Sequence, residues 1–256
     1  MKSHVGFAAF VLPLVLACTP CHGATVTIGS SKDNTLFESL TGDASNGQGD
    51  SFFAGRTGPN DGSHIRRGTI AFDLASALPA NALITGVSLT LFLAQEGSLG
   101  FGETVSLHEL SADWGEGTSF ATSGRSGASS PNDATWLHRF FSTTPWATPG
   151  GDFVARVSAS ATMNTSFQAY TWTGPGMVQD VQGWLNSPST NFGWIIIGDE
   201  TITNTALRFN TKEALTVSNR PQLSITYTVV PEPGSAAMLS ASALLLLGGR
   251  RSRRPL

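Results

Sequence analysis

The stretch ITGVSLTLFLA, residues 84–94, decides the fold. Apolar residues occupy every second position of its second part, namely Val87, Leu89, Leu91 and Leu93. Polar or bulky residues fill the alternate positions, namely Ser88, Thr90 and Phe92. Because successive side chains of a strand point to opposite faces, this pattern predicts a half-buried strand with one face in a core.

Further short strands are expected on both sides of this one. Turn-forming residues separate them, and the predicted strands cover residues 24–28, 51–56, 67–74, 104–110, 193–197, 205–210 and 221–229. Residues 32–50 are rich in polar residues and glycine and are expected to form a long loop or an irregular edge of the sheet. Residues 118–151 are expected to be mostly loop.

One helix is expected among these strands. Val178, Val181 and Leu185 lie at helical spacing within residues 176–186, and the helix should end before Pro188. Many strands and one short helix predict an all-β fold, a jelly-roll-like β-sandwich.

The bulk composition excludes some functions. Residues 24–229 carry 10 basic and 17 acidic side chains, a balance that argues against nucleic acid as a partner. Both cysteines, Cys18 and Cys21, precede this segment, so it has no disulfide framework. The size of the segment suits a single β domain.

The N-terminus has the pattern of a signal peptide, residues 1–23. Lys2 precedes an apolar run at residues 5–17, and the triplet ending at Gly23 suits signal peptidase. The run of about 13 residues is short for a membrane-spanning helix, which needs about 20. The alternative is a lipoprotein signal that uses Cys18.

The C-terminus combines three features within residues 230–256. Pro231, Glu232 and Pro233 keep the backbone extended, and a hydrophobic segment expected to form a helix follows at residues 235–249. A basic cluster ends the chain: Arg250, Arg251, Arg253 and Arg254. Such a segment would insert into a membrane with its arginines on the cytoplasmic side, as a weak and transient anchor. An ordinary membrane anchor is the alternative.

This tail resembles the PEP-CTERM sorting signal of Gram-negative bacteria. The resemblance implies recognition by an exosortase and delivery to the cell surface or to an extracellular polysaccharide matrix.

The segments between the two ends resemble, in their order, the DNRLRE family of secreted β-sandwich domains, which is related to a group of carbohydrate-binding modules. The resemblance runs through residues 32–36, 53–56, 66–74, 78–82, 113–117, Trp146 with 150–153, the helix around Trp184, 191–194 and 207–213. Residues 33–38 depart from the family's signature, which has an arginine and a second acidic residue there. The resemblance makes Arg66, Arg67 and Arg208 partners of Asp73 or Glu213 in structural ion pairs.

No enzyme motif is present. Residues 24–229 contain three histidines, His64, His108 and His138, and no nucleophile or metal-binding motif. Paired carboxylates would suffice for a polysaccharide-cleaving enzyme, and two pairs are available: Asp113 with Glu116, and Asp199 with Glu200. These acids are also typical of turns, so we expect a non-catalytic protein.

Sugar binding on a β-sandwich commonly uses exposed aromatic rings. Trp184 and Trp194 fit core positions, whereas four tryptophans in apparent loops are candidates for a glycan surface: Trp114, Trp136, Trp146 and Trp172. We expect no cofactor and no metal site; the alternative is a structural calcium ion with Asp33, Asp73 or Glu213 as ligands, although the sequence contains no calcium loop. Three hypotheses follow: an exported polysaccharide-binding protein, a purely structural matrix or adhesion protein, and a polysaccharide-cleaving enzyme.

Overall fold

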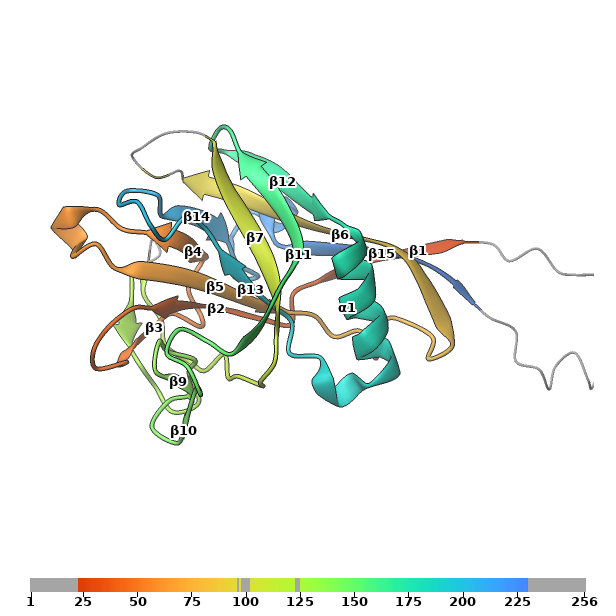
Figure 1. Ribbon diagram of the computed structural model, residues 1–256, viewed down its shortest axis with the longest axis horizontal. Coiled ribbons are helices and arrows are strands. Elements are labelled where there is room, and N and C mark those ends of the chain that lie inside the picture. Colours follow the sequence, from red (N-terminus) through yellow and green to blue (C-terminus); the bar gives the residue numbers. More distant parts are fainter. Residues whose placement is uncertain (1–22, 96, 98–101, 123–124, 230–256) are drawn as a thin grey trace, which may run out of the picture.

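The computed structural model describes residues 23–95, 97, 102–122 and 125–229 (Figure 1). Nearly all of the predicted signal peptide and the whole predicted sorting signal, including Pro231, Glu232, Pro233 and the four arginines, lie outside these residues. Within the described residues, no helix has the length and hydropathy to cross a membrane. Every described helix and strand lies within residues 24–229.

The chain is mostly β-structure with one α-helix. The larger strands are β1 Ala24–Gly29, β2 Lys32–Phe37, β4 Ser51–Arg56, β5 Ile65–Ala71, β6 Ala82–Gln95, β7 Glu103–Leu110, β11 Phe153–Met163, β12 Gln168–Thr173, β13 Trp194–Ile197, β14 Leu207–Asn210 and β15 Gln222–Val229. Short strands form two small ladders, β3 Ala44–Ser45 with β8 Gly127–Ala128, and β9 His138–Phe140 with β10 Thr144–Pro145. Single turns of 3₁₀ helix cover Pro59–Asp61, Pro188–Thr190 and Val217–Asn219.

One curled antiparallel sheet contains the larger strands. Its order is β1-β15-β6-β14-β4-β5-β13-β7-β11, with β12 also paired to β6 and β2 to β5. Strand β4 pairs with both β14 and β5 and so joins two halves of the sheet, which enclose the main hydrophobic core. Both described ends of the chain lie at one end of the molecule, and the β4–β5 turn lies at the other (Figure 1).

Strand β6 has the alternation that its sequence predicts. Leu89, Leu91 and Leu93 are fully buried, whereas Ser88 and Thr90 face outward on the opposite side. Cross-strand partners on β15 and β12 keep this phase, because Leu223 and Trp172 both lie opposite Leu89. The central strand therefore carries much of the main core.

The helix α1 Pro175–Asn186 confirms the predicted helix, beginning one residue earlier than expected. It packs on β6 and β11 and buries Met177, Val181, Trp184 and Leu185 in the main core. Proline at the first position suits a helix start because its missing N–H would have no partner there.

The prediction of a loop or an irregular edge over residues 32–50 is wrong at its beginning, where a regular strand lies. Strand β2 pairs with β5 along six residues, and five of its side chains are buried. The sequence did not predict this strand because its buried residues Asp33, Asn34 and Thr35 are polar. Their polar atoms are buried against distant parts of the chain. Residues 153–173 also form two strands, β11 and β12, for which no strand was predicted.

Candidate functional site

The four tryptophans proposed as a glycan surface are buried, and that prediction is corrected here. Trp114 is 1 % exposed, Trp136 8 %, Trp146 4 % and Trp172 0 %. Three of the indole N–H groups donate to backbone carbonyls at 2.9 Å: Trp114 to Phe192, Trp146 to Thr135 and Trp172 to Val105. No ring face is left for a sugar to stack on.

The reason lies in the long segment between β7 and β11. It folds over the outer face of one half of the sheet and forms a second hydrophobic cluster, in which Trp114, Trp136 and Trp146 pack with Leu36, Leu110 and Ile195. Trp172 lies on β12 rather than in a loop and faces the main core. Trp184 and Trp194 are core residues, as predicted.

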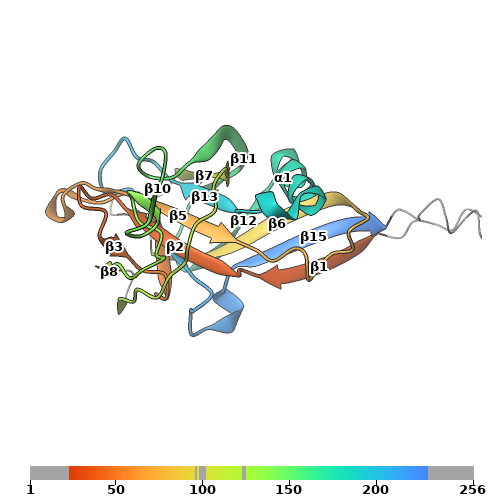
Figure 2. The same ribbon diagram turned by 90° about the horizontal axis from the view of Figure 1, so that it is seen from below.

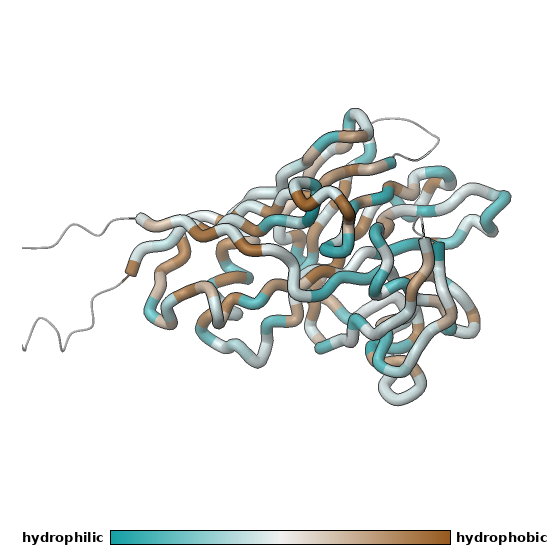
Figure 3. The backbone as a smooth tube through the Cα atoms, turned by 180° about the vertical axis from the view of Figure 1, so that it is seen from behind, coloured by the Kyte–Doolittle hydropathy of each residue, from teal (hydrophilic) through white to brown (hydrophobic). Residues whose placement is uncertain are grey.

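A hollow of about 840 Å³ lies around the β4–β5 turn, and we call it the polar groove. Its lining includes Phe37, Phe53, Asn60, Asp61, Arg66, Gln95, Arg125 and Asn204. They come from β2, β4, β5, β6 and three connecting segments. The turn forms the mostly hydrophilic end of the molecule opposite the chain ends (Figure 3). The groove therefore gathers hydrogen-bonding side chains from distant parts of the sequence.

Arg66 is the most desolvated charged group of the groove. Its guanidinium lies 5.0 Å from the centre of the Phe37 ring and donates to the Ile65 carbonyl at 2.9 Å. Among the described residues, no carboxylate forms an ion pair with it. Burial lowers the pKa of Arg66, and the carboxylates of Glu38 and Asp61 offset this only in part. An anion in the groove would supply the partner that Arg66 lacks.

Arg125 brings a second guanidinium to the same groove. Its side chain is exposed, and its backbone N–H donates to the Thr122 carbonyl at 3.2 Å. The lining set holds one carboxylate, Asp61, against these two arginines. The groove is thus locally basic although the domain is acidic.

Sequence reasoning missed this site because it placed Arg66 in an ion pair with Asp73 or Glu213. That expectation is wrong: neither carboxylate pairs with Arg66 or Arg67. Two neighbouring arginines on one strand must point to opposite faces, and this signal was available in the sequence. Arg67 points to the other face, where Glu200 accepts from its Nε at 2.6 Å and its Nη2 at 2.9 Å.

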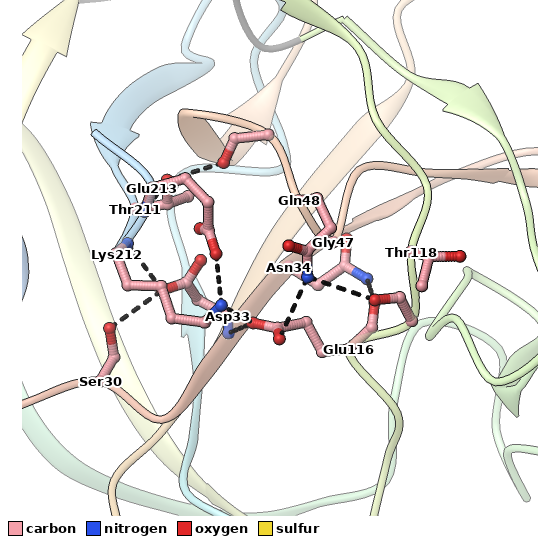
Figure 4. A network of polar contacts seen from close by, with 12 residues as sticks. Ser30, Asp33, Asn34, Gly47, Gln48, Glu116, Thr118, Thr211, Lys212 and Glu213 are labelled. Atoms are coloured by element: carbon pink, nitrogen blue, oxygen red, sulfur yellow. Dashed lines mark hydrogen bonds and ion pairs between the residues drawn. The ribbon is translucent and has the colours of Figure 1, made fainter. Parts of the chain in front are cut away.

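A network of charged side chains surrounds Asp33 on β2 (Figure 4). Its Oδ2 accepts from Ser30 Oγ at 3.0 Å and from the Lys212 N–H at 3.1 Å. Its own N–H donates to Glu116 Oε1 at 2.9 Å. The Lys212 ammonium pairs with Glu116 at 2.9 Å and also with Glu213. These contacts tie β2 to two distant loops.

Asp33 is 1 % exposed, so no substrate reaches it. Burial, and after it the negative charge of Glu213, raises the pKa of Asp33 to about 8. Asp33 Oδ1 and Glu213 Oε2 are both buried without a hydrogen-bond partner. A proton on Asp33 would remove one of the two negative charges that repel each other here, those of Asp33 and Glu213.

The candidate ligands of the alternative calcium site are only partly brought together. Asp33 and Glu213 lie in the network, but Asp73 lies elsewhere, exposed, and accepts from the Ser76 N–H at 3.4 Å. Within the described residues, no three histidine, cysteine or acidic side chains are arranged to hold a metal ion.

The proposed carboxylate pairs are engaged in other contacts. Asp113 pairs with Lys32 at 2.8 Å, and Glu116 belongs to the Asp33 network. Asp199 accepts from the Thr201 N–H at 2.7 Å, while Glu200 holds Arg67. None of these four lines the polar groove.

No protein-family model and no curated protein sequence matches this chain.

Proposed function

We propose that this protein is an exported, non-catalytic protein of the cell surface or extracellular matrix of a Gram-negative bacterium, and that it binds an acidic polysaccharide in the polar groove. In this proposal the described domain is a jelly-roll-like β-sandwich, a signal peptidase removes residues 1–23, and an exosortase processes the PEP-CTERM-like tail after transient membrane insertion. The observation that carries the binding proposal is the desolvated, unpaired guanidinium of Arg66.

A sugar carboxylate fits Arg66 by its chemistry. A carboxylate accepts two parallel hydrogen bonds from a guanidinium, and such charge-assisted bonds are stronger than bonds between neutral groups. A bound carboxylate would also restore part of the stabilisation that the positive charge of Arg66 loses when burial removes water from it. Arg125 places a second cation in the groove, which suits a polymer with repeated carboxylates.

The other groove residues suit sugar hydroxyl groups. The amide groups of Asn60, Gln95 and Asn204 can donate and accept, and Phe53 adds an apolar surface. Because residues 24–229 are acidic as a whole, an acidic chain should be held at the groove and repelled elsewhere.

The test uses residues 24–229 and soluble alginate, measured by calorimetry with and without calcium. Arg66→Gln is expected to weaken binding at least about tenfold, because a hydrogen bond to a charged group contributes about 1.5–3 kcal/mol. Arg125→Gln should weaken it less, since its side chain is exposed.

Arg139→Gln on β9 is the matched control, because this arginine lies outside the groove. Equal loss in the Arg66 and Arg139 variants would contradict a site in the groove. Absence of binding to alginate and to the host's own matrix polysaccharide would favour the purely structural alternative. Circular dichroism of each variant separates lost binding from lost folding.

A further inference from the structure

Strand β1 ends the strand order on one side, and its outer edge is free within the described residues. Its inner edge pairs with β15 along six consecutive residues without a bulge. Figure 2 shows β1 at the margin of the sheet, with no described strand beyond it. A free strand edge presents unpaired N–H and C=O groups to any strand that can approach.

The strand at the other end of the order is protected. Register shifts interrupt the pairing of β11 with β7 at two places, and Arg156 lies within the first, between Phe153 and Val157. Bulges and charged side chains are the usual protection of an edge strand. Strand β1, with the sequence ATVTIG, contains no charge, no proline and no bulge. Strands β12 and β2 also pair with one strand only, but β12 contacts β11, and β2 contacts β3 and β4. Among the described strands, β1 packs closely against β15 alone, so its outer edge is open whereas the β11 edge is protected.

The side chains of β1 also suit a partner strand. Val26 and Ile28 pack against the main core but are only partly buried, so the core is incompletely covered at this edge. On the outer face, Thr25 and Thr27 hydrogen-bond to Thr226 at 3.0 Å and Ser224 at 2.7 Å. These bonds hold the edge strand in a regular conformation.

We propose that two copies of this chain pair through β1, antiparallel, to form one continuous sheet. A second copy is the occupant because β1 is complementary to itself: its polar backbone edge meets an identical edge, and Val26 and Ile28 of both copies cover one another. The pairing has twofold symmetry and uses the open edge of both copies, so it closes at the dimer. The blunted β11 edge opposes further growth.

The dimer would change what the polar groove can do, and this consequence rests on the proposed function. The β4–β5 turn and β1 lie toward opposite ends of the molecule (Figure 1), so the two grooves would lie at the far ends of the dimer. Each dimer could then cross-link two polysaccharide chains.

Light scattering coupled to size exclusion tests the dimer on residues 24–229 without any polysaccharide, so its result is independent of the proposed function. The wild-type segment is expected to elute with twice the mass of one chain. Thr25→Lys/Thr27→Lys places like charges across the new pairing and should give the mass of one chain. Thr171→Lys, on the same outer face but on β12, is the matched control and should remain dimeric.

Cysteine cross-linking checks the edge itself, because residues 24–229 contain no cysteine. Under oxidation, Thr25→Cys and Thr27→Cys, alone or mixed, should give a covalent dimer, and Thr171→Cys should not. A wild-type segment with the mass of one chain at millimolar concentration would overturn the proposal. A dimer that the lysine pair leaves intact would overturn it equally, since another surface would then be responsible.

Discussion

Asp33 is a buried aspartate of strand β2, and segments far away in the sequence supply its hydrogen-bond partners. Its partners Glu116 and Lys212 lie 83 and 179 residues away in the sequence. Local patterns contain no information on such partners. In contrast, neighbouring Arg66 and Arg67 point to opposite faces, a result that strand alternation alone predicts.

The raised pKa of Asp33 makes stability depend on pH. Its pKa is about 8 in the folded state against an ordinary 3.8, so between these values the folded state holds a proton that the unfolded state has lost. The contribution is fully present below about pH 4 and is lost as the pH rises toward 8, by up to about 1.4 kcal/mol for each pH unit. Asp33→Asn should remove this slope and unfold at a higher urea concentration than the wild type at pH 8.

Urea unfolding at pH 5, 6.5 and 8 measures the effect. Asp50→Asn changes an exposed aspartate and should keep the wild-type slope. If Asp33→Asn unfolded with the same pH dependence as the wild type, the buried proton would have to lie on another group.

Among the elements, helix α1 has an apolar face that the sequence predicts. It also has an anchor that the sequence does not predict, namely the buried side chain of Asp180 with its contacts to the sheet. The apolar spacing of Val178, Val181 and Leu185 predicted the helix. It gave no sign of Asp180, whose side chain is fully buried and pairs with Arg156 of β11. Trp194 of β13 donates to Asp180 Oδ2 at 2.8 Å. Strand β11 was missed because its apolar and polar residues do not alternate with burial: Val154 and Val157 are exposed, whereas Ser158 is buried.

Removing this anchor should loosen the helix from the sheet. Asp180→Ala leaves Arg156 with Glu109, at 3.7 Å, as its remaining carboxylate and leaves the Trp194 N–H without an acceptor, so we expect a loss of about 3 kcal/mol. Asp180→Asn keeps an acceptor for Trp194 and should lose less. Gln179→Ala, exposed on the same helix, is the control and should lose less than about 0.5 kcal/mol. Unfolding in urea ranks the three, and an equal loss for Gln179→Ala and Asp180→Ala would contradict the anchor.

In the whole molecule, the two predicted signals connect to one end and the polar groove lies at the other. Ala24 of β1 lies opposite Tyr227 of β15, so both predicted signals connect to the same end of the domain. The polar groove lies around the β4–β5 turn at the other end (Figure 1). The sequence predicted most of the strands, and the two signals stay predictions because nearly all of their residues lie outside the described ones. It could not predict the groove, because the groove exists only where turns from distant segments meet.

This separation predicts that processing of the tail and stability of the domain are independent. Replacing Pro231 and Pro233 with alanine removes the restriction that keeps the backbone extended, so a host with an exosortase should retain the full chain in its membrane fraction. Ser240→Ala, within the hydrophobic segment, should leave release unchanged. The purified alanine variant should melt at the wild-type temperature, because both hydrophobic clusters lie within residues 24–229. Release of the alanine variant at the wild-type level would leave the tail as an ordinary anchor, whereas retention with unchanged melting would assign the defect to sorting alone.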